Sequence, residues 1–254
     1  MSDTPIVLCV GGHDPTGGAG IQADIETVRA LGGRAITIVT ALTVQDTRNV
    51  SAIDPVSTPT FRATLATLLA DIRPDAVKIG LLAGCDQVDL LAASLAGLDV
   101  PVVLDPVLAA GGGFGFGNAD IIRCIRDRLL PRTTLATPNR EEARRLTGEH
   151  EPARAATALL DLGAGAVLLT GADEAGGDEV ENQLWLPGPT SSQFRWPLLP
   201  GVYHGSGCTL ASACAVSLGR GMAPEVAVTE AQTFTHQALT RATAPGHGQF
   251  LPTR

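Results

Sequence analysis

Short apolar runs alternate with longer segments of helical periodicity along most of the chain. Residues 6–10 and 100–104 are brief and almost entirely apolar, as expected for strands buried on both faces of a parallel sheet. Residues 21–31 and 225–242 instead repeat apolar side chains every three or four positions, which is typical of one face of a helix. The alternation predicts βαβ units, and therefore a mainly parallel sheet with helices on its faces.

The same pattern predicts the remaining elements. Strands are expected at residues 6–10, 35–39, 76–79, 100–104, 135–137 and 166–170, and helices at 21–31, 60–69, 86–95, 121–130, 153–162, 210–218 and 225–242. Two alternating runs at 183–186 and 193–196 flank a Pro-Gly-Pro turn and predict an antiparallel addition at one edge of the sheet.

Composition restricts the function classes. The chain has 254 residues, of which 44% are hydrophobic and 17% charged, so we expect one domain over residues 1–254. The net charge of −8 argues against a basic surface for nucleic acid or anionic membranes. Residues 1–5 lack a basic region and no apolar segment is long enough to span a bilayer, so neither a signal peptide nor a membrane helix is expected. A cytoplasmic protein acting on a small molecule fits best.

The five cysteines are scattered and odd in number. Cys9, Cys85, Cys124, Cys208 and Cys214 include no Cys-x-x-Cys pair, which argues against a disulfide framework or a zinc site. We therefore expect a reducing compartment.

A glycine-rich loop that leads directly into a helix carries the strongest chemical signal. Gly205 and Gly207 allow a sharp turn that uncovers the amides of residues 206–209, and the positive end of the following helix faces the same point. This predicts an anion site. Cys208 at the helix start is expected to have a pKa below its free value of about 8.5, which would make it a base or nucleophile. In the alternative interpretation the glycines mark a plain turn and Cys208 only packs.

A second glycine loop, residues 11–20, follows the first predicted strand. It does not match Gly-x-Gly-x-x-Gly and has no P-loop lysine, so dinucleotide binding is not expected. Thr43, Gln45 and Asp105 lie at or beyond the carboxyl ends of later strands, where ligands gather in such sheets. Asn139 and Glu142 are spaced to begin a helix as a cap, a role that can coexist with ligand binding.

Two motifs resemble one family. His-Gly-Ser-Gly-Cys-Thr at 204–209 resembles the nucleotide-site signature of ribokinase-like small-molecule kinases, in the branch that carries cysteine where most members carry aspartate. Residues 12–24 resemble the N-terminal signature of that branch, the hydroxymethylpyrimidine and phosphomethylpyrimidine kinases of thiamine biosynthesis. The resemblance implies a three-layer ribokinase-like α/β fold. It also implies ATP-dependent phosphorylation of 4-amino-5-hydroxymethyl-2-methylpyrimidine and its monophosphate, with Mg²⁺.

The resemblance also implies roles for individual residues. Cys208 would be the base, with the backbone of Gly205, Ser206 and Gly207 around the transferred phosphoryl group. The pyrimidine would contact Gly12, Ala19, Asp24, Thr43, Gln45, Leu81 and Val107. The magnesium–nucleotide complex would contact Asp105, Asn139, Glu142, Thr170 and Gly171, with Asp105 and Glu142 nearest the metal. A solvated helix face is the alternative for Asp24.

The chain departs from this family at Thr170, where many members have a lysine near the phosphates. Lys78 is the single lysine of the sequence, so magnesium, the loop amides or an arginine such as Arg140 would have to meet the phosphoryl charge. We expect a homodimer, although no stretch marks an interface. A pyridoxal-type vitamin kinase and a non-catalytic pyrimidine-binding module remain as alternatives. The sequence leaves open whether one or both phosphorylation steps occur, and whether the glycine tract 111–117 is a flap or a linker.

Overall fold

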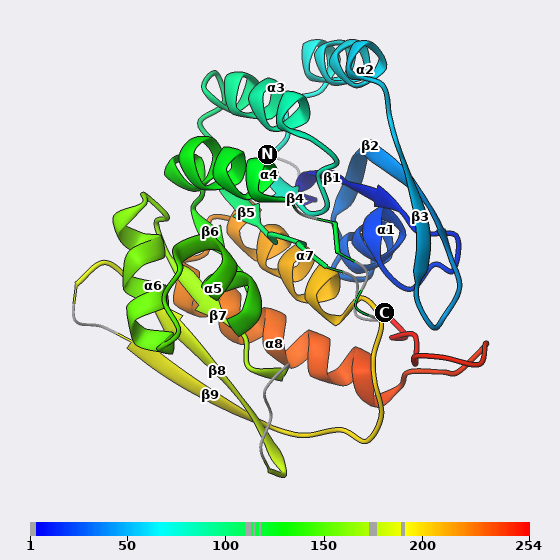
Figure 1. Ribbon diagram of the computed structural model, residues 1–254, viewed down its shortest axis with the longest axis vertical. Helices are drawn as coiled ribbons and strands as arrows, with labels where there is room; N and C mark the ends of the chain where they lie inside the picture. Colours follow the sequence, from blue (N-terminus) through cyan, green and yellow to red (C-terminus); the bar gives the residue numbers. More distant parts are fainter. Residues whose placement is uncertain (1–3, 110–112, 114, 117, 173–176, 189–190) are drawn as a thin grey trace.

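The structure of the protein is a computed structural model that describes residues 4–109, 113, 115–116, 118–172, 177–188 and 191–254. It contains a nine-stranded sheet with helices on both faces (Figure 1). The strands are β1 (Ile6–His13), β2 (Arg34–Gln45), β3 (Val50–Pro55), β4 (Ala76–Ile79), β5 (Val102–Leu104), β6 (Leu135–Ala136), β7 (Val167–Leu169), β8 (Glu179–Trp185) and β9 (Ser191–Pro197). The helices are α1 (Gly20–Ala30), α2 (Thr58–Asp71), α3 (Cys85–Leu95), α4 (Ala119–Cys124), η1 (Ile125–Leu129), η2 (Leu130–Arg132), α5 (Arg140–Thr147), α6 (Pro152–Asp161), α7 (Ser206–Gly219) and α8 (Pro224–Thr240).

The strand order, β3-β2-β1-β4-β5-β6-β7-β8-β9, confirms a mainly parallel sheet with antiparallel edges. β2, β1, β4, β5, β6 and β7 are parallel to one another, so their carboxyl ends meet along one edge. β8 and β9 form the antiparallel addition predicted from the alternating runs. β3, which pairs antiparallel with β2, was not predicted, and β2 extends six residues beyond its predicted end at Val39, to Gln45.

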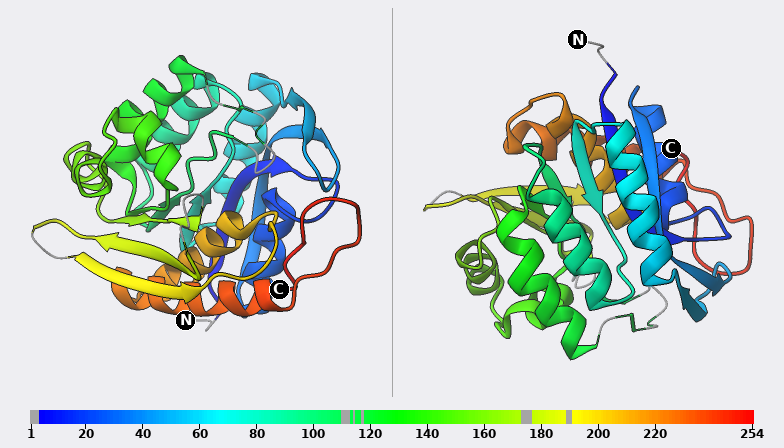
Figure 2. Two further views of the ribbon diagram at one scale, coloured as in Figure 1. Left: turned by 60° about the horizontal axis from the view of Figure 1, so that its bottom comes forward. Right: turned by 90° about the horizontal axis from the view of Figure 1, so that it is seen from above.

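Two hydrophobic cores lie on opposite sides of the sheet. One core contains the buried faces of α2 to α6, and the other contains α1, α7 and α8 (Figure 2). α7 is buried on almost every side because it lies between the sheet and α8, and its continuous run from Thr209 to Leu218 is apolar or small as that position requires. The sheet and α7 are therefore the rigid frame on which the strand-end loops are held.

The predicted helix at 121–130 is divided. It begins as α4 at Ala119, continues as the wider π-helical turn η1, and ends in the tight turn η2, where a proline stands in the first turn. The predicted glycine tract 111–117 lies largely outside the described residues.

One expectation about the cysteines is wrong. Cys85 and Cys124 form a disulfide, with Cα atoms 5.8 Å apart and a sequence separation of 39. The packing of α3 against α4 brings them together, and no local spacing in the sequence reveals such a contact. The cysteine pattern therefore no longer supports a reducing compartment.

None of the helices in the described part of the chain is long and apolar enough to cross a membrane.

Candidate active site

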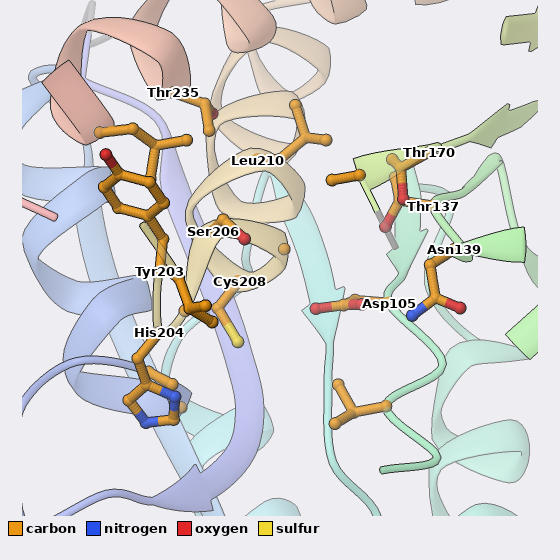
Figure 3. A pocket seen from close by; sticks show the side chains of 18 of the residues that line it. Asp105, Thr137, Asn139, Thr170, Tyr203, His204, Ser206, Cys208, Leu210 and Thr235 are labelled. Atoms are coloured by element: carbon orange, nitrogen blue, oxygen red, sulfur yellow. The ribbon is translucent and has the colours of Figure 1, made fainter. Parts of the chain in front are cut away.

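A cavity of about 640 Å³ opens at the carboxyl ends of the parallel strands, next to the first turn of α7. Cavities of this size at this edge of an α/β sheet are the usual position of small-molecule sites. We call residues 13–20 and 203–208 the loop wall, and Asp105, Thr137, Asn139 and Thr170 the strand wall. Figure 3 shows Cys208 on the loop wall facing the strand-wall residue Asp105.

The start of α7 forms the centre of the loop wall. Gly205 is the N-cap, with φ of 81°, a left-handed conformation that favours glycine. A Cβ at this position would also collide with the carbonyl oxygen of Gly18, so the two glycine loops touch backbone to backbone. The hydroxyl of Thr209 donates to the Gly205 carbonyl at 2.8 Å, which fixes the turn. The first amides of α7 remain available to an anion.

Asp14 holds the other glycine loop. Its carboxylate accepts hydrogen bonds from the Thr16 amide at 2.8 Å and the Ala19 amide at 2.7 Å, and it lies 2.9 Å from His204 Nε2. Burial alone would raise the pKa of Asp14, but the hydrogen bonds from His204 and Thr16 lower it below its ordinary value. His204 thus connects the two loops of the wall through one satisfied carboxylate.

Cys208 does not have the acidic thiol expected from its place at a helix start. Burial, with a smaller contribution from the carboxylates of Asp105 and Asp24, raises the pKa of Cys208 to about 12. The Lys78 ammonium and the Gly20 amide lower it, but by less. The expectation was wrong because desolvation outweighs the helix terminus in this partly buried pocket. At neutral pH the thiol therefore carries its proton.

The strand wall contains polar atoms that lack partners. Asp105 Oδ2 and Thr137 Oγ1 are buried and form no hydrogen bond within the described residues. Burial raises the pKa of Asp105 to about 6, while Lys78 lowers it and Asp24 raises it. Such atoms are costly unless a ligand completes them.

Asn139 and Glu142 form the predicted capping box at the start of α5. The Asn139 side chain accepts from the Glu142 amide at 2.8 Å, and Glu142 accepts from the Asn139 amide at 3.0 Å. The other Glu142 oxygen accepts from the Leu108 amide at 3.3 Å. Both residues also line the cavity, so the capping role and a ligand role share the same side chains.

Asp24 is not where the sequence suggested. It is fully buried, so the solvated helix face is excluded, yet it does not line the cavity either. Its Oδ1 lies 2.8 Å from Lys78 Nζ and accepts from the Ser212 hydroxyl at 2.7 Å. Direct contact between Asp24 and a pyrimidine is therefore not supported. The carboxylate instead compensates a buried lysine whose position the sequence reasoning missed.

Gly171 and Arg140 do not line the cavity, although their sequence neighbours do. The Gly171 amide donates to Asn182 Oδ1 at 3.1 Å, and a side chain at 171 would collide with the Glu181 carbonyl oxygen and the Arg140 guanidinium. Thr170, one residue earlier, does line the cavity. Arg140, the arginine named as a possible phosphate-site cation, is thus absent from the cavity lining.

The remaining predicted site residues all line the cavity. They are Gly12, Ala19, Thr43, Gln45, Leu81, Asp105, Val107, Asn139, Glu142, Thr170 and residues 205–208.

One end of the cavity was missed from the sequence. Gln232 Oε1 accepts from Asn182 Nδ2 at 2.8 Å and from Trp196 Nε1 at 3.1 Å, and the Trp196 and His236 rings lie 5.1 Å apart. These four residues come from β8, β9 and α8 and form no motif, so no sequence signal could have found them. We call them the aromatic end of the cavity.

Comparison with known proteins agrees with this architecture. The pyridoxal kinase of Staphylococcus aureus, solved in complex with AMP-PCP and pyridoxal, matches with a TM-score of 0.89 and 28% identity over 98% of this chain and 93% of that one. The fold is thus that of the ribokinase-like kinases, as the sequence resemblance implied.

Sequence relatives narrow the class. Residues 14–253 match the family described as phosphomethylpyrimidine kinase. The hydroxymethylpyrimidine/phosphomethylpyrimidine kinase of Streptomyces coelicolor is 39% identical over 96% of this chain and 92% of its own. A thiamine biosynthesis bifunctional protein of Geobacter sulfurreducens is 38% identical over 95% of this chain and 50% of its own. The chain belongs to the phosphomethylpyrimidine kinase family.

Proposed function

We propose that the protein transfers the γ-phosphoryl group of ATP to 4-amino-5-hydroxymethyl-2-methylpyrimidine and to its monophosphate, as a kinase of thiamine biosynthesis. The observation that carries the proposal is the position of Cys208 and the α7 amides opposite Asp105 in one cavity, in a member of this kinase family. Phosphoryl transfer depends mainly on positioning and on stabilising charge, and a helix N-terminus supplies both without moving.

The two substrates would occupy opposite ends of the cavity. The pyrimidine is assigned to the end lined by Ala19, Thr43, Gln45 and Leu81, and the nucleotide base to the aromatic end. The phosphates then lie between them at the α7 amides. Cys208 would take the proton of the substrate hydroxyl. Because the thiol carries its own proton at neutral pH, Cys208 must first release that proton to solvent and act as the thiolate.

A magnesium ion fits the strand wall. Asp105 Oδ2 and Thr137 Oγ1 are unpartnered oxygens, which are the donors that Mg²⁺ prefers. Both Glu142 oxygens accept backbone amides, so Glu142 would act through water. No cluster of three acidic, histidine or cysteine ligands exists among the described residues, which leaves the other positions to phosphates and water. The ion would neutralise phosphate charge, and Asp105→Asn should raise the magnesium concentration needed for activity.

A homodimer is the proposed assembly. Leu42 and Val44 on β2 are 50% and 60% exposed, while Thr43 and Gln45 between and beyond them line the cavity. An apolar pair at this strand suits an interface between two copies. Sedimentation of the parent and of Leu42→Glu tests this: a parent that sediments as a monomer contradicts it.

The deciding experiment counts phosphates. The protein is incubated with ATP and the hydroxymethylpyrimidine, and the products are resolved by mass. One added phosphate identifies the first step alone, and two identify both. Absence of pyrimidine-dependent ADP release would contradict the proposal.

Pyridoxal kinase activity is the second candidate, because the S. aureus pyridoxal kinase is so similar in fold. Parallel assays with pyridoxal at equal concentration separate the two. A higher kcat/KM for pyridoxal than for the pyrimidine would favour this candidate.

A further inference from the structure

Lys78 is the buried charged group that the proposed function leaves unexplained. It lies on the central strand β4, its residue is 0% exposed, and it reaches the floor of the cavity. Buried lysines are costly unless another group compensates them. Among the described residues that line the cavity, Lys78 is the only lysine or arginine.

Asp24 and Ser212 hold the Lys78 ammonium in place. Nζ lies 2.8 Å from Asp24 Oδ1, and the Ser212 hydroxyl binds the same oxygen at 2.7 Å. Space is kept above the β4 end by Gly80, where a Cβ would lie only 2.8 Å from Nζ. The charge is therefore anchored at one point by residues of α1 and α7, and a side chain at 80 would disturb it.

Lys78 lines the same cavity as Cys208 and Asp105. Burial alone would lower the pKa of Lys78, but Asp24, and then Cys208 and Asp105, raise it, so the side chain stays charged. An ammonium has three donors, and Asp24 is its only ion-pair partner among the described residues. Donors of the ammonium therefore remain available in a cavity that Cys208 and Asp105 also line.

We propose that Lys78 stabilises phosphoryl transfer electrostatically. Its fixed positive charge, anchored by Asp24, stabilises the negative charge that develops between the acceptor oxygen and the γ-phosphoryl group. This inference rests on the proposed function. The acceptor oxygen forms its bond to phosphorus as the bond from phosphorus to the ADP oxygen breaks, and the hydroxyl proton passes to the Cys208 thiolate, which forms when the thiol first releases its own proton to solvent. A fixed cation in a site shielded from water needs no reorganisation during that step. Lys78 thereby supplies the cation that Thr170 does not.

A variant pair separates this role from a purely structural ion pair. Lys78→Met leaves Asp24 buried and uncompensated, so the protein should unfold more easily and turn over slowly. Lys78→Met combined with Asp24→Asn removes both charges and keeps an acceptor for Ser212. We expect the double variant to regain most of the parent's unfolding midpoint, to bind ADP within about threefold of the parent, and still to lose about 100-fold in kcat. Lys78→Arg should recover part of the turnover.

Arg123→Met is the matched control, because Arg123 forms an exposed ion pair with Asp120 and neither residue lines the cavity. It should match the parent in every measurement. A double variant that turns over within about threefold of the parent would overturn the proposal and reduce Lys78 to a partner for Asp24. A defect confined to KM for the pyrimidine would overturn it as well.

The single lysine allows a test on the unaltered protein. Labelling lysine with ¹⁵N at Nζ gives one ammonium signal in an NMR spectrum, that of Lys78. ADP, magnesium and aluminium fluoride, which imitate the transferring phosphoryl group, should shift this signal strongly, and ADP alone should shift it less. An unmoved signal would overturn the inference even if the variants did not fold. A parent protein that fails to phosphorylate the pyrimidine would overturn the proposed function instead, and the NMR shift would then decide the role of Lys78.

Discussion

The two walls of the cavity each contain a buried aspartate, and the two aspartates differ in their hydrogen bonding and in their pKa. Asp14 of the loop wall is 2% exposed and accepts from two backbone amides and from Thr16, with His204 beside it. Asp105 of the strand wall is 5% exposed and has an oxygen without a partner. The pKa of Asp14 is lowered and that of Asp105 is raised to about 6.

The difference shows which wall folding completes. Hydrogen bonds satisfy the Asp14 carboxylate as soon as the two glycine loops meet, so the loop wall is formed before any ligand arrives. The strand wall contains buried oxygens without hydrogen-bond partners. They lower the stability of the ligand-free protein and are available to a bound cation or phosphate. Stability and function therefore coincide at one wall and conflict at the other.

The largest expected effect is the loss of the loop wall in Asp14→Asn. The amide group would face the Ala19 N–H, and we expect a loss of about 3 kcal/mol in the free energy of unfolding. Because the folded pKa of Asp14 lies below the unfolded value near 3.8, its stabilisation is fully present above pH 4 and is lost only as pH falls further. Denaturant unfolding of the parent and the variant at pH 7 measures the difference.

Asp46→Asn is the control for that measurement. Asp46 also accepts two backbone amides, those of Arg48 and Asn49, but it is exposed. It should change stability much less than Asp14→Asn. Equal losses would mean that burial of Asp14 is unimportant.

Cys208→Ala tests the loop-wall residue that faces Asp105 on the strand wall. We expect kcat to fall about 100-fold or more, because positioned proton acceptors contribute that much, while the backbone amides of α7 remain to hold ATP. Steady-state kinetics with separate ADP binding would show the defect in turnover alone. Cys208→Asp should recover part of the rate. Parent-like turnover of Cys208→Ala would leave the thiol only a packing role.

Asp105→Asn should change the free energy of unfolding in the opposite direction from Asp14→Asn when no ligand is bound. The unfolded carboxyl ionises near pH 3.8 and the folded one near 6, so ionisation destabilises the fold increasingly over that range. The variant should therefore gain stability over the parent as pH rises from 4 to 6, reaching about 3 kcal/mol above pH 7. Unfolding with a chelator present measures it, and a pH-independent difference would contradict the assignment.

The sequence predicted what local patterns determine. Residues 76–79 were assigned their strand with the observed bounds, and the apolar run from Leu210 to Leu218 located α7. Cys208 and Asp105 were both expected at the cavity because each follows a recognisable turn, one at a helix start and one at a strand end. Such positions depend on chain direction, which periodicity reveals.

The failures concern partners that only packing supplies. Asp24 and Lys78 are 54 positions apart in the printed sequence, and nothing near either residue shows that they pair. The pKa of Cys208 was expected to fall because its helix position is visible in sequence, whereas the burial that raises it is not. The Cys85–Cys124 disulfide and the aromatic end of the cavity were missed for the same reason.

The smallest expected effect compares two glutamines at opposite ends of the cavity. Gln45 Nε2 donates to Thr43 Oγ1 at 2.7 Å, and Thr43 donates to the His13 carbonyl at 2.9 Å, so Gln45→Leu disturbs the proposed pyrimidine end. Gln232→Leu removes the acceptor shared by Asn182 and Trp196 at the aromatic end. Each loss of a directional polar partner should weaken the binding of one ligand by about tenfold, equivalent to about 1.4 kcal/mol.

Calorimetric titration of each variant with the pyrimidine and with ADP should give a crossed result: Gln45→Leu binds ADP normally, and Gln232→Leu binds the pyrimidine normally. If either variant weakened both ligands equally, the two ends would not be separate sites, and the assignment of one substrate to each end would be wrong.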